Sequence, residues 1–309
     1  MSTLRQFEYL VAVVDEGSFT RAAELLHVTQ PALSHQVRAL ERDVGGPLLE
    51  RLARSVRLTP MGRALLPHAR AALADAERAR LAARQASGLE SGELRLATVY
   101  SVSLGVLPPV LRAWRRQHSG VQIRLFEHRH TAELKAAMTA GQADLAVGPP
   151  PSDWDGPVHA LGVEEFVVVL PPEDPVADEN ATRIDLAMLS GHGWVHYSQE
   201  NGLAEVLDQA CASAGFQPQA AVRTEQTAAA PMLAAAGLGS ALVPANIIPP
   251  HFDGRLLRPD PPVHRTLTAY TRRGADPLTT AFIDALARKA VVLPDHVRRR
   301  LGSSAVVSR

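Results

Sequence analysis

The chain has 309 residues, 46% of them hydrophobic and 21% charged, which is an ordinary composition for a folded protein of two or three domains. Its 32 basic and 32 acidic side chains give a formal net charge of zero, so no global field draws the protein to nucleic acid. This balance disfavours a protein that coats DNA regardless of sequence, and any affinity for DNA must come from locally placed charge.

Two helices are predicted before residue 27. The first is amphipathic and runs from Leu4 to Val14. Ser18 opens the second, with Arg21 where a full capping box would have Glu. The second helix is expected to pack through Phe19, Ala22, Ala23, Leu25 and Leu26.

A third helix is predicted after a turn at residues 27–28. Thr29 is a candidate N-cap, Pro31 stands in the first turn, and Gly45-Gly46 mark the end. Its apolar residues follow helical spacing and form one buried stripe: Leu33, Val37, Leu40 and Val44. Three helices with this turn are typical of a helix-turn-helix core.

The other face of the third helix suits DNA. It carries Gln30, Ser34 and Arg38 one turn apart, flanked by His35 and Arg42. Arg can hold guanine and Gln can hold adenine through two hydrogen bonds each, while Ser and His can contact phosphates. A merely solvated helix face would look similar.

A two-stranded wing is predicted next, with a turn at residues 53–55 between Leu49 and Leu58. Arg51, Arg54 and Arg57 would crowd its tip and flank and contact the phosphate backbone. Solvated arginines are the alternative.

A long helix is predicted from Met61 to Ala86, roughly 40 Å in length. Small and apolar residues alternate in steps of four and three, which is the seam of a coiled coil and indicates dimerisation. The seam residues are Leu65, Ala69, Ala72, Ala76, Ala79 and Ala83. Gly88, Ser91 and Gly92 then indicate a hinge.

Strands and helices alternate after the hinge, which predicts an α/β fold with parallel strands wrapped by helices. Strands are expected at 94–99, 121–126, 143–148, 165–170, 192–197, 220–224, 240–244 and 266–272. Helices are expected at 108–118, 131–141, 204–214, 227–237 and 277–291.

The first sixty or so residues, from LRQFEYLVAVVDEGSFTRAAELLHVTQPALSHQVRALERDVGG to LTPMGRALL, resemble LysR-type transcriptional regulators. Gln30, Pro31, Ser34 and Arg38 match the family's DNA-contact positions, whereas His35 stands where the family commonly has Arg. The resemblance also implicates Ser18, Thr20 and Thr29 in DNA binding.

The second half resembles, by pattern, the family's two-lobed effector domain, which is similar to periplasmic solute-binding proteins. This implies a winged helix-turn-helix domain (1–60), a coiled-coil linker helix and hinge (61–92), lobe I (93–163 with 267–292), lobe II (164–266) and a flexible tail (293–309). The chain is expected to cross between lobes near 163–165 and 265–267, with a cleft between them.

An effector cleft is expected beyond the carboxyl ends of the strands, where hydroxyl and amide residues open helices. Free N–H groups at helix N-termini favour a small anion, such as a carboxylate, although ordinary N-capping explains each residue singly. Ser101 and Thr131 match ligand positions of the family. The full candidate set is Tyr100, Ser101, Val102, Ser103, Thr131, Gly148, Tyr197, Ser198, Thr224, Gln226 and Pro244.

Enzyme signatures are absent from the sequence. Gly237 to Ser240 lie between a helix and a strand, the reverse of a dinucleotide fingerprint, and no Gly-x-Ser-x-Gly elbow or phosphate loop occurs. His192 and His196 sit in a strand-like run, so no metal and no cofactor is expected. The alternative function is an α/β ligand-binding protein or enzyme whose N-terminal helices serve only for oligomerisation. A constitutive repressor with a vestigial cleft is a third possibility.

Cys211 is the single cysteine, so an intrachain disulfide is impossible, and a small buried hydrophobe is the expected role. With no apolar run near the roughly 20 residues of a membrane span, a cytoplasmic protein is expected. The resemblance implies four partners: double-stranded promoter DNA, a small-molecule effector, RNA polymerase and further copies of the chain, as a dimer of dimers.

Overall fold

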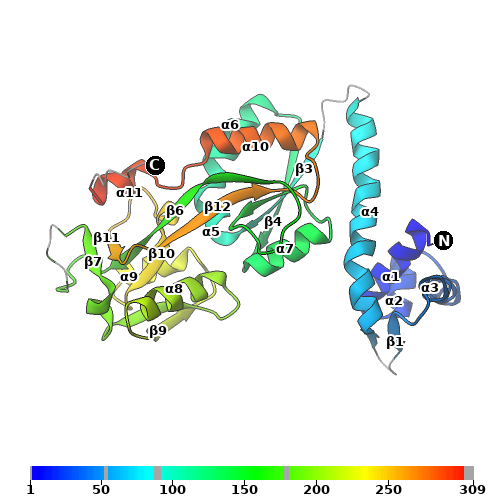
Figure 1. The fold of residues 1–309 in the computed structure, drawn as a ribbon, viewed down its shortest axis with the longest axis horizontal. Coiled ribbons are helices and arrows are strands. Elements are labelled where there is room, and N and C mark those ends of the chain that lie inside the picture. Colours follow the sequence, from blue (N-terminus) through cyan, green and yellow to red (C-terminus); the bar gives the residue numbers. More distant parts are fainter. Residues whose placement is uncertain (1, 52–54, 87–91, 177, 179–180, 303–309) are drawn as a thin grey trace. The chain divides into compact units, whose positions relative to one another are not determined.

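The computed structural model describes residues 2–51, 55–86, 92–176, 178 and 181–302 (Figure 1). The chain divides into two compact units, residues 1–93 with 135–144 and residues 94–134 with 145–309. No helix in the described ranges combines the length and apolar character that crossing a bilayer requires.

The first unit is built on three short helices and a two-stranded sheet that gather at one end of a long helix (Figure 1). The helices are α1 (Leu4–Glu16), α2 (Phe19–Leu25), α3 (Gln30–Val44) and α4 (Pro60–Ala86). The strands β1 (Leu49–Arg51) and β2 (Val56–Leu58) pair antiparallel, as expected for a wing.

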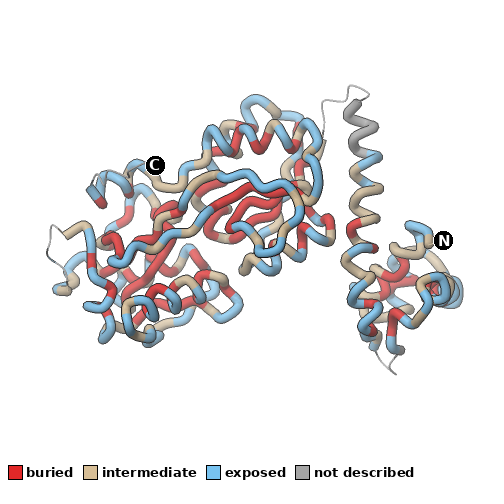
Figure 2. The backbone as a smooth tube through the Cα atoms, in the orientation of Figure 1, coloured by how far each residue is buried: buried red, intermediate tan, exposed pale blue. Residues whose placement is uncertain are grey.

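The predicted stripe of α3 is confirmed, because Leu33, Val37 and Leu40 are fully buried in the core between α1, α2 and α3. Figure 2 shows buried positions gathered where these helices meet. Leu25 does not pack as expected, since it is 58% exposed. It stands beside the Ala22–Ala23 face of α2 and points away from the core.

The long helix α4 differs in part from the predicted dimer seam. Leu65 packs against the core of the three short helices, and Ala69 is fully buried within the chain. Because α1 packs against α4, this end of the seam is covered inside one chain. Ala72 and Ala76 are half-buried and Ala79 is exposed, while the side chain of Ala83 lies outside the described residues.

The second unit contains a mixed sheet in the order β4-β3-β5-β12-β6-β11-β7, with β10 also paired to β6. Its first lobe, lobe I, has strands β3 (Glu93–Val99), β4 (Gln122–His128) and β5 (Leu145–Gly148). The helices in these ranges are α5 (Tyr100–Gly105), α6 (Leu107–Gln117) and α7 (Thr131–Thr139). Helix α10 (Pro277–Lys289) packs against α6, with Trp114 edge-on to Phe282 at 5.0 Å between ring centroids.

Lobe II follows β6 in the chain. Its strands are β7 (Arg183–Asp185), β8 (Gly193–Tyr197), β9 (Gln219–Thr224), β10 (Ala241–Pro244) and β11 (Arg255–Asp260). Its helices are η1 (Leu186–Leu189), α8 (Gly202–Ser213), α9 (Ala229–Ala235) and η2 (Ala245–Ile247). A continuous apolar core, which includes Trp194, Tyr197 and Cys211, fills this lobe.

Two long strands cross between the lobes, β6 (Val158–Leu170) and β12 (His264–Tyr270), and they run side by side in Figure 1. They pair antiparallel, with Arg265 opposite Glu164 and His264 opposite Glu165. One half of β6 pairs with β12 and the other half with β10 and β11. The partner of β6 changes between Glu165 and Phe166, next to residues 163–165, where a crossing was predicted.

The end of the chain differs from the flexible tail expected for 293–309. Residues Asp295–Arg300 form helix α11, with Val297 buried in the lobe II core. Arg300 donates to the carbonyl of Phe252 at 2.6 Å. An apolar anchor and a charged hydrogen bond hold this segment in place, whereas residues 303–309 lie outside the described range.

Candidate DNA-reading surface and effector cavity

The exposed face of α3 carries most of the predicted DNA contacts. Gln30, Pro31, His35 and Arg38 are all exposed, and Arg38 Nε donates to the carbonyl of Ser34 at 3.3 Å. This hydrogen bond directs the Arg38 side chain along the helix. This surface therefore exposes several hydrogen-bond donors that suit contact with a DNA groove.

Ser34 differs from expectation, since only 3% of it is exposed. It borders the buried stripe of α3 and lies within the packed side of the helix, so its side chain is not presented with Gln30 and Arg38. Thr20 is exposed. Ser18 and Thr29 act as N-caps, because their hydroxyls accept from the backbone N–H groups of Arg21 and Ala32, each at 3.4 Å.

The wing is tied to α3 by Glu41, a residue that the sequence did not single out. Its Oε1 accepts from the backbone N–H groups of Leu48 at 2.9 Å and Leu49 at 3.3 Å. Arg57 is exposed on β2, whereas Arg54 and the side chain of Arg51 lie outside the described residues. Glu41 thus fixes the start of the wing relative to α3, the helix that carries most of the predicted DNA contacts.

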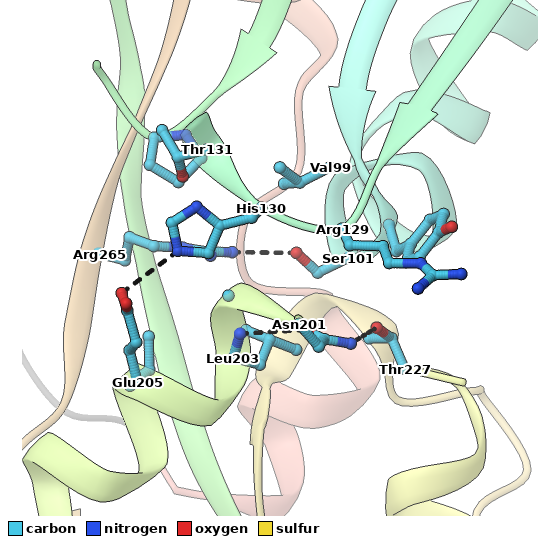
Figure 3. Close-up of a pocket in the computed structure, with 14 residues that line it drawn as sticks. Val99, Ser101, Arg129, His130, Thr131, Asn201, Leu203, Glu205, Thr227 and Arg265 are labelled. Atoms are coloured by element: carbon cyan, nitrogen blue, oxygen red, sulfur yellow. Dashed lines mark hydrogen bonds and ion pairs between the residues drawn. The ribbon is translucent and has the colours of Figure 1, made fainter. Parts of the chain in front are cut away.

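A cavity of about 220 Å³ opens in the second unit, at the boundary of the two lobes (Figure 3). Three helix starts meet there: α5 after Val99, α7 after His130 and α8 after Asn201. The lining residues are Val99, Tyr100, Ser101, Arg129, His130, Thr131, Pro149, Asn201, Gly202, Leu203, Glu205, Val206, Thr227 and Arg265.

Lobe I and lobe II touch at the rim of this cavity. The backbone N–H of Gly202 donates to the carbonyl of Arg129 at 2.9 Å, and His130 Nε2 lies 3.4 Å from Glu205 Oε2. A hydrogen bond with Tyr100 raises the pKa of Arg129 above its ordinary value. The rim thus joins the N-terminus of α8 to the segment before α7.

Polar groups are oriented around the floor of the cavity (Figure 3). Asn201 caps α8 by accepting from Leu203 N–H at 3.0 Å and donates to Thr227 Oγ1 at 3.3 Å. Arg265 donates from Nη2 to Ser101 Oγ at 2.9 Å, which joins a crossing strand to the start of α5.

The structure brings Tyr100, Ser101 and Thr131 of the predicted set together around this cavity. The others do not line it. Val102 and Tyr197 are fully buried, and the Tyr197 hydroxyl donates to the Leu242 carbonyl at 3.1 Å. Burial raises the pKa of this phenol, as expected for a core tyrosine.

The remaining predicted residues serve local structure. Ser103 Oγ donates to the Tyr100 carbonyl at 2.9 Å, and the Gly148 carbonyl accepts from Thr268 at 3.1 Å. Ser198 N–H donates to the Thr224 carbonyl, Thr224 Oγ1 accepts from Gln226 N–H, and Pro244 precedes η2. These contacts stabilise the fold, and none of the remaining predicted residues lines the cavity.

Family comparisons match both units. The pattern of bacterial regulatory helix-turn-helix proteins of the lysR family covers residues 4–63, and that of the LysR substrate binding domain covers residues 87–291. The chain belongs to the LysR family. It is a LysR-family transcriptional regulator with a DNA-binding domain and an effector-binding domain.

Relatives of this LysR-family regulator are similar over most of their length. The transcriptional regulator ShiR of Corynebacterium glutamicum (strain R) is 33% identical over 242 residues, 77% of this chain and 81% of that protein. The hca operon activator HcaR of Escherichia coli (strain K12) is 34% identical over 245 residues, 78% of this chain and 81% of that protein.

Solved structures of LysR-family regulators are similar to this chain in fold. Full-length CbnR in complex with its target DNA has a TM-score of 0.64 at 26% identity, covering 93% of this chain and all of CbnR (100%). OxyR from Pseudomonas aeruginosa shares the fold, with a TM-score of 0.73 at 23% identity over 95% of this chain and 97% of that chain. Regulators of the LysR family bind DNA and are not enzymes.

Cys211, the single cysteine, has a structural role in this LysR-family regulator. Cys211 is fully buried, and burial raises the pKa of its thiol to about 12, so the reactive thiolate is scarcely formed at neutral pH. Across the described part of the chain, no three His, Cys, Asp or Glu side chains are grouped to hold a metal ion.

Sequence reasoning left several lining residues out of the candidate set, above all Arg129, His130 and Arg265. Arg129 and His130 directly precede Thr131, so the rule that strand ends open onto ligands could have found them. Arg265 lies more than 160 positions from Ser101 in the chain, and no local pattern connects the two.

Proposed function

We propose that this regulator senses a small organic anion in the interlobe cavity and thereby changes how it holds promoter DNA. One observation carries the proposal: Ser101, Thr131, Arg265 and the N-terminus of α8 converge on one cavity at the boundary of two lobes. Hydroxyls, a guanidinium and the positive end of a helix all favour negative charge.

The cavity adjoins the strands that cross between the lobes, so a ligand that contacts both lobes favours one of their arrangements over others. In a dimer of dimers built through α4, that arrangement would set the spacing of the α3 helices on promoter DNA and the access of RNA polymerase in the cytoplasm. By linkage, the effector and the favoured DNA arrangement strengthen each other's binding.

Screening small organic acids by thermal unfolding tests the cavity. We expect at least one acid to raise the melting temperature, because a ligand at 100 times its Kd adds about 2.7 kcal/mol to the free energy of unfolding. Ser101→Ala and Thr131→Ala should each weaken that acid about tenfold, since each removes a hydrogen bond to a charged group. Operator affinity without the acid should stay unchanged.

Ser213→Ala is the matched control, because its hydroxyl donates to the Gln209 carbonyl near the far end of α8. It should leave acid binding unaltered. Equal loss of acid binding in Ser213→Ala and the two cavity variants would contradict an anion site at Ser101 and Thr131.

A further inference from the structure

A buried ion pair lies where the two lobes join. Glu164 on β6 is fully buried, and its Oε2 accepts from Arg265 Nε at 2.7 Å and Nη2 at 2.5 Å across the β6–β12 ladder. A buried carboxylate is tolerated only when it is paired and hydrogen-bonded. Glu164 therefore fixes one edge of the Arg265 guanidinium.

Asn246 links the same carboxylate to both lobes. Its Nδ2 donates to Glu164 Oε1 at 2.6 Å, and η2, which carries Asn246, packs against α5 of lobe I. A Cβ atom at Gly105 of α5 would lie 2.4 Å from the Asn246 carbonyl oxygen, so this contact requires glycine. The ion pair is thus held between α5 and η2, at the join of the lobes.

The other edge of Arg265 is free. Nε and Nη2 are used by Glu164 and Ser101, whereas Nη1 has no hydrogen-bond partner in the described ranges of the chain. Arg265 lines the cavity, and 16% of its side chain is exposed (Figure 3). An oriented guanidinium with an unused N–H pair is a recognition group for a carboxylate.

We propose that Arg265 binds the anionic group of the effector through Nη1, beside Ser101. Glu164 and Asn246 position the guanidinium and do not contact the effector. This inference rests on the proposed function, because it specifies how the same cavity recognises its ligand. Since Glu164 also neutralises Arg265, its charge opposes the arrival of an anion. The Glu164–Arg265 ion pair therefore sets the affinity for anions as well as the orientation of the guanidinium.

Substitutions of Glu164 and of Arg265 should change the affinity for anions in opposite directions. Arg265→Gln removes the cation and should weaken anion binding about tenfold to a hundredfold. Glu164→Gln leaves Arg265 without its counter-ion, so an anion should bind at least about threefold more tightly. A purely structural pair would make both variants bind less well.

Acetate and benzoate are the probes, each compared with its neutral amide, acetamide or benzamide, at constant ionic strength. Thermal unfolding of the full-length protein is followed as each probe is titrated. Because Arg265→Gln leaves Glu164 buried without a cation, the double variant Glu164→Gln/Arg265→Gln provides a folded form without the charge pair. It should bind both carboxylates about tenfold to a hundredfold more weakly than the wild type does.

The neighbouring ion pair supplies a matched control. Glu165, next to Glu164 on β6, accepts from Arg258 Nε of β11 at 2.5 Å, and neither residue lines the cavity that Arg265 lines. Glu165→Gln/Arg258→Gln should lower the melting temperature and leave carboxylate affinity unchanged.

The proposal would be supported if a carboxylate, and not its amide, stabilises the wild type saturably. The carboxylate must also bind at least about tenfold more weakly to the double variant and more tightly to Glu164→Gln. No saturable effect of either carboxylate, or a weaker effect in Glu164→Gln, would overturn it. Operator binding measured on the same samples reports separately on regulation. A wild type that binds its operator and responds to an effector while Arg265→Gln responds equally well would reject only the role of Arg265.

Discussion

Arg38→Ala is expected to weaken operator binding by about 1–3 kcal/mol for each half-site, the usual contribution of an arginine that reads guanine. Arg38 is exposed on α3, and its hydrogen bond to the Ser34 carbonyl orients the guanidinium along the helix. Because two α3 helices would meet two half-sites in a dimer, the total loss should be about twice as large.

Fluorescence anisotropy at fixed salt measures this loss, with Arg112→Ala as the control. Arg112 is an exposed arginine on α6 of the effector-binding unit, so the control removes the same charge without touching α3. An equal loss of affinity for operator DNA and for random DNA would show that Arg38 contacts phosphate only. No loss on either DNA would contradict α3 as the reading helix.

Leu40→Ala is expected to lower the free energy of unfolding of the DNA-binding unit by about 2–5 kcal/mol. Leu40 is fully buried in the core of α1, α2 and α3, and truncation leaves a cavity that these short helices cannot fill. The effector-binding unit has its own core, so its stability should not change.

Urea unfolding monitored by circular dichroism tests this expectation, together with cavity binding as a probe of the second unit. Leu25→Ala is the matched control, because Leu25 is 58% exposed and should change stability by less than about 0.5 kcal/mol. A similar loss of unfolding free energy in Leu40→Ala and Leu25→Ala would contradict the place of Leu40 in the core of this unit.

Local patterns predicted the DNA-binding unit well. The N-caps at Ser18 and Thr29, the stop at Gly45 and the stripe through Leu33 depend on neighbours within one or two turns, and the structure confirms them. The burial of Ser34 was harder to predict, because helical spacing gives the centre of a buried face and not its width.

The cavity was predicted only in part, for a physical reason. Ser101 and Thr131 were found because strand ends followed by helix starts leave a local signature. Arg265 comes from a crossing strand, and its place beside Ser101 depends on sheet register over a long separation. Tyr197 also follows the strand-end rule, yet packing of lobe II directs it into the core.

Footprinting on the DNA upstream of this gene, at stated salt and with Arg38→Ala alongside, tests the central claim most directly. We expect the wild type to protect an imperfect inverted repeat, the variant to leave it open, and an acid found in the thermal screen to alter the protected length. A wild-type protein that selects no sequence from genomic fragments, with or without that acid, would contradict effector-controlled promoter recognition by this chain.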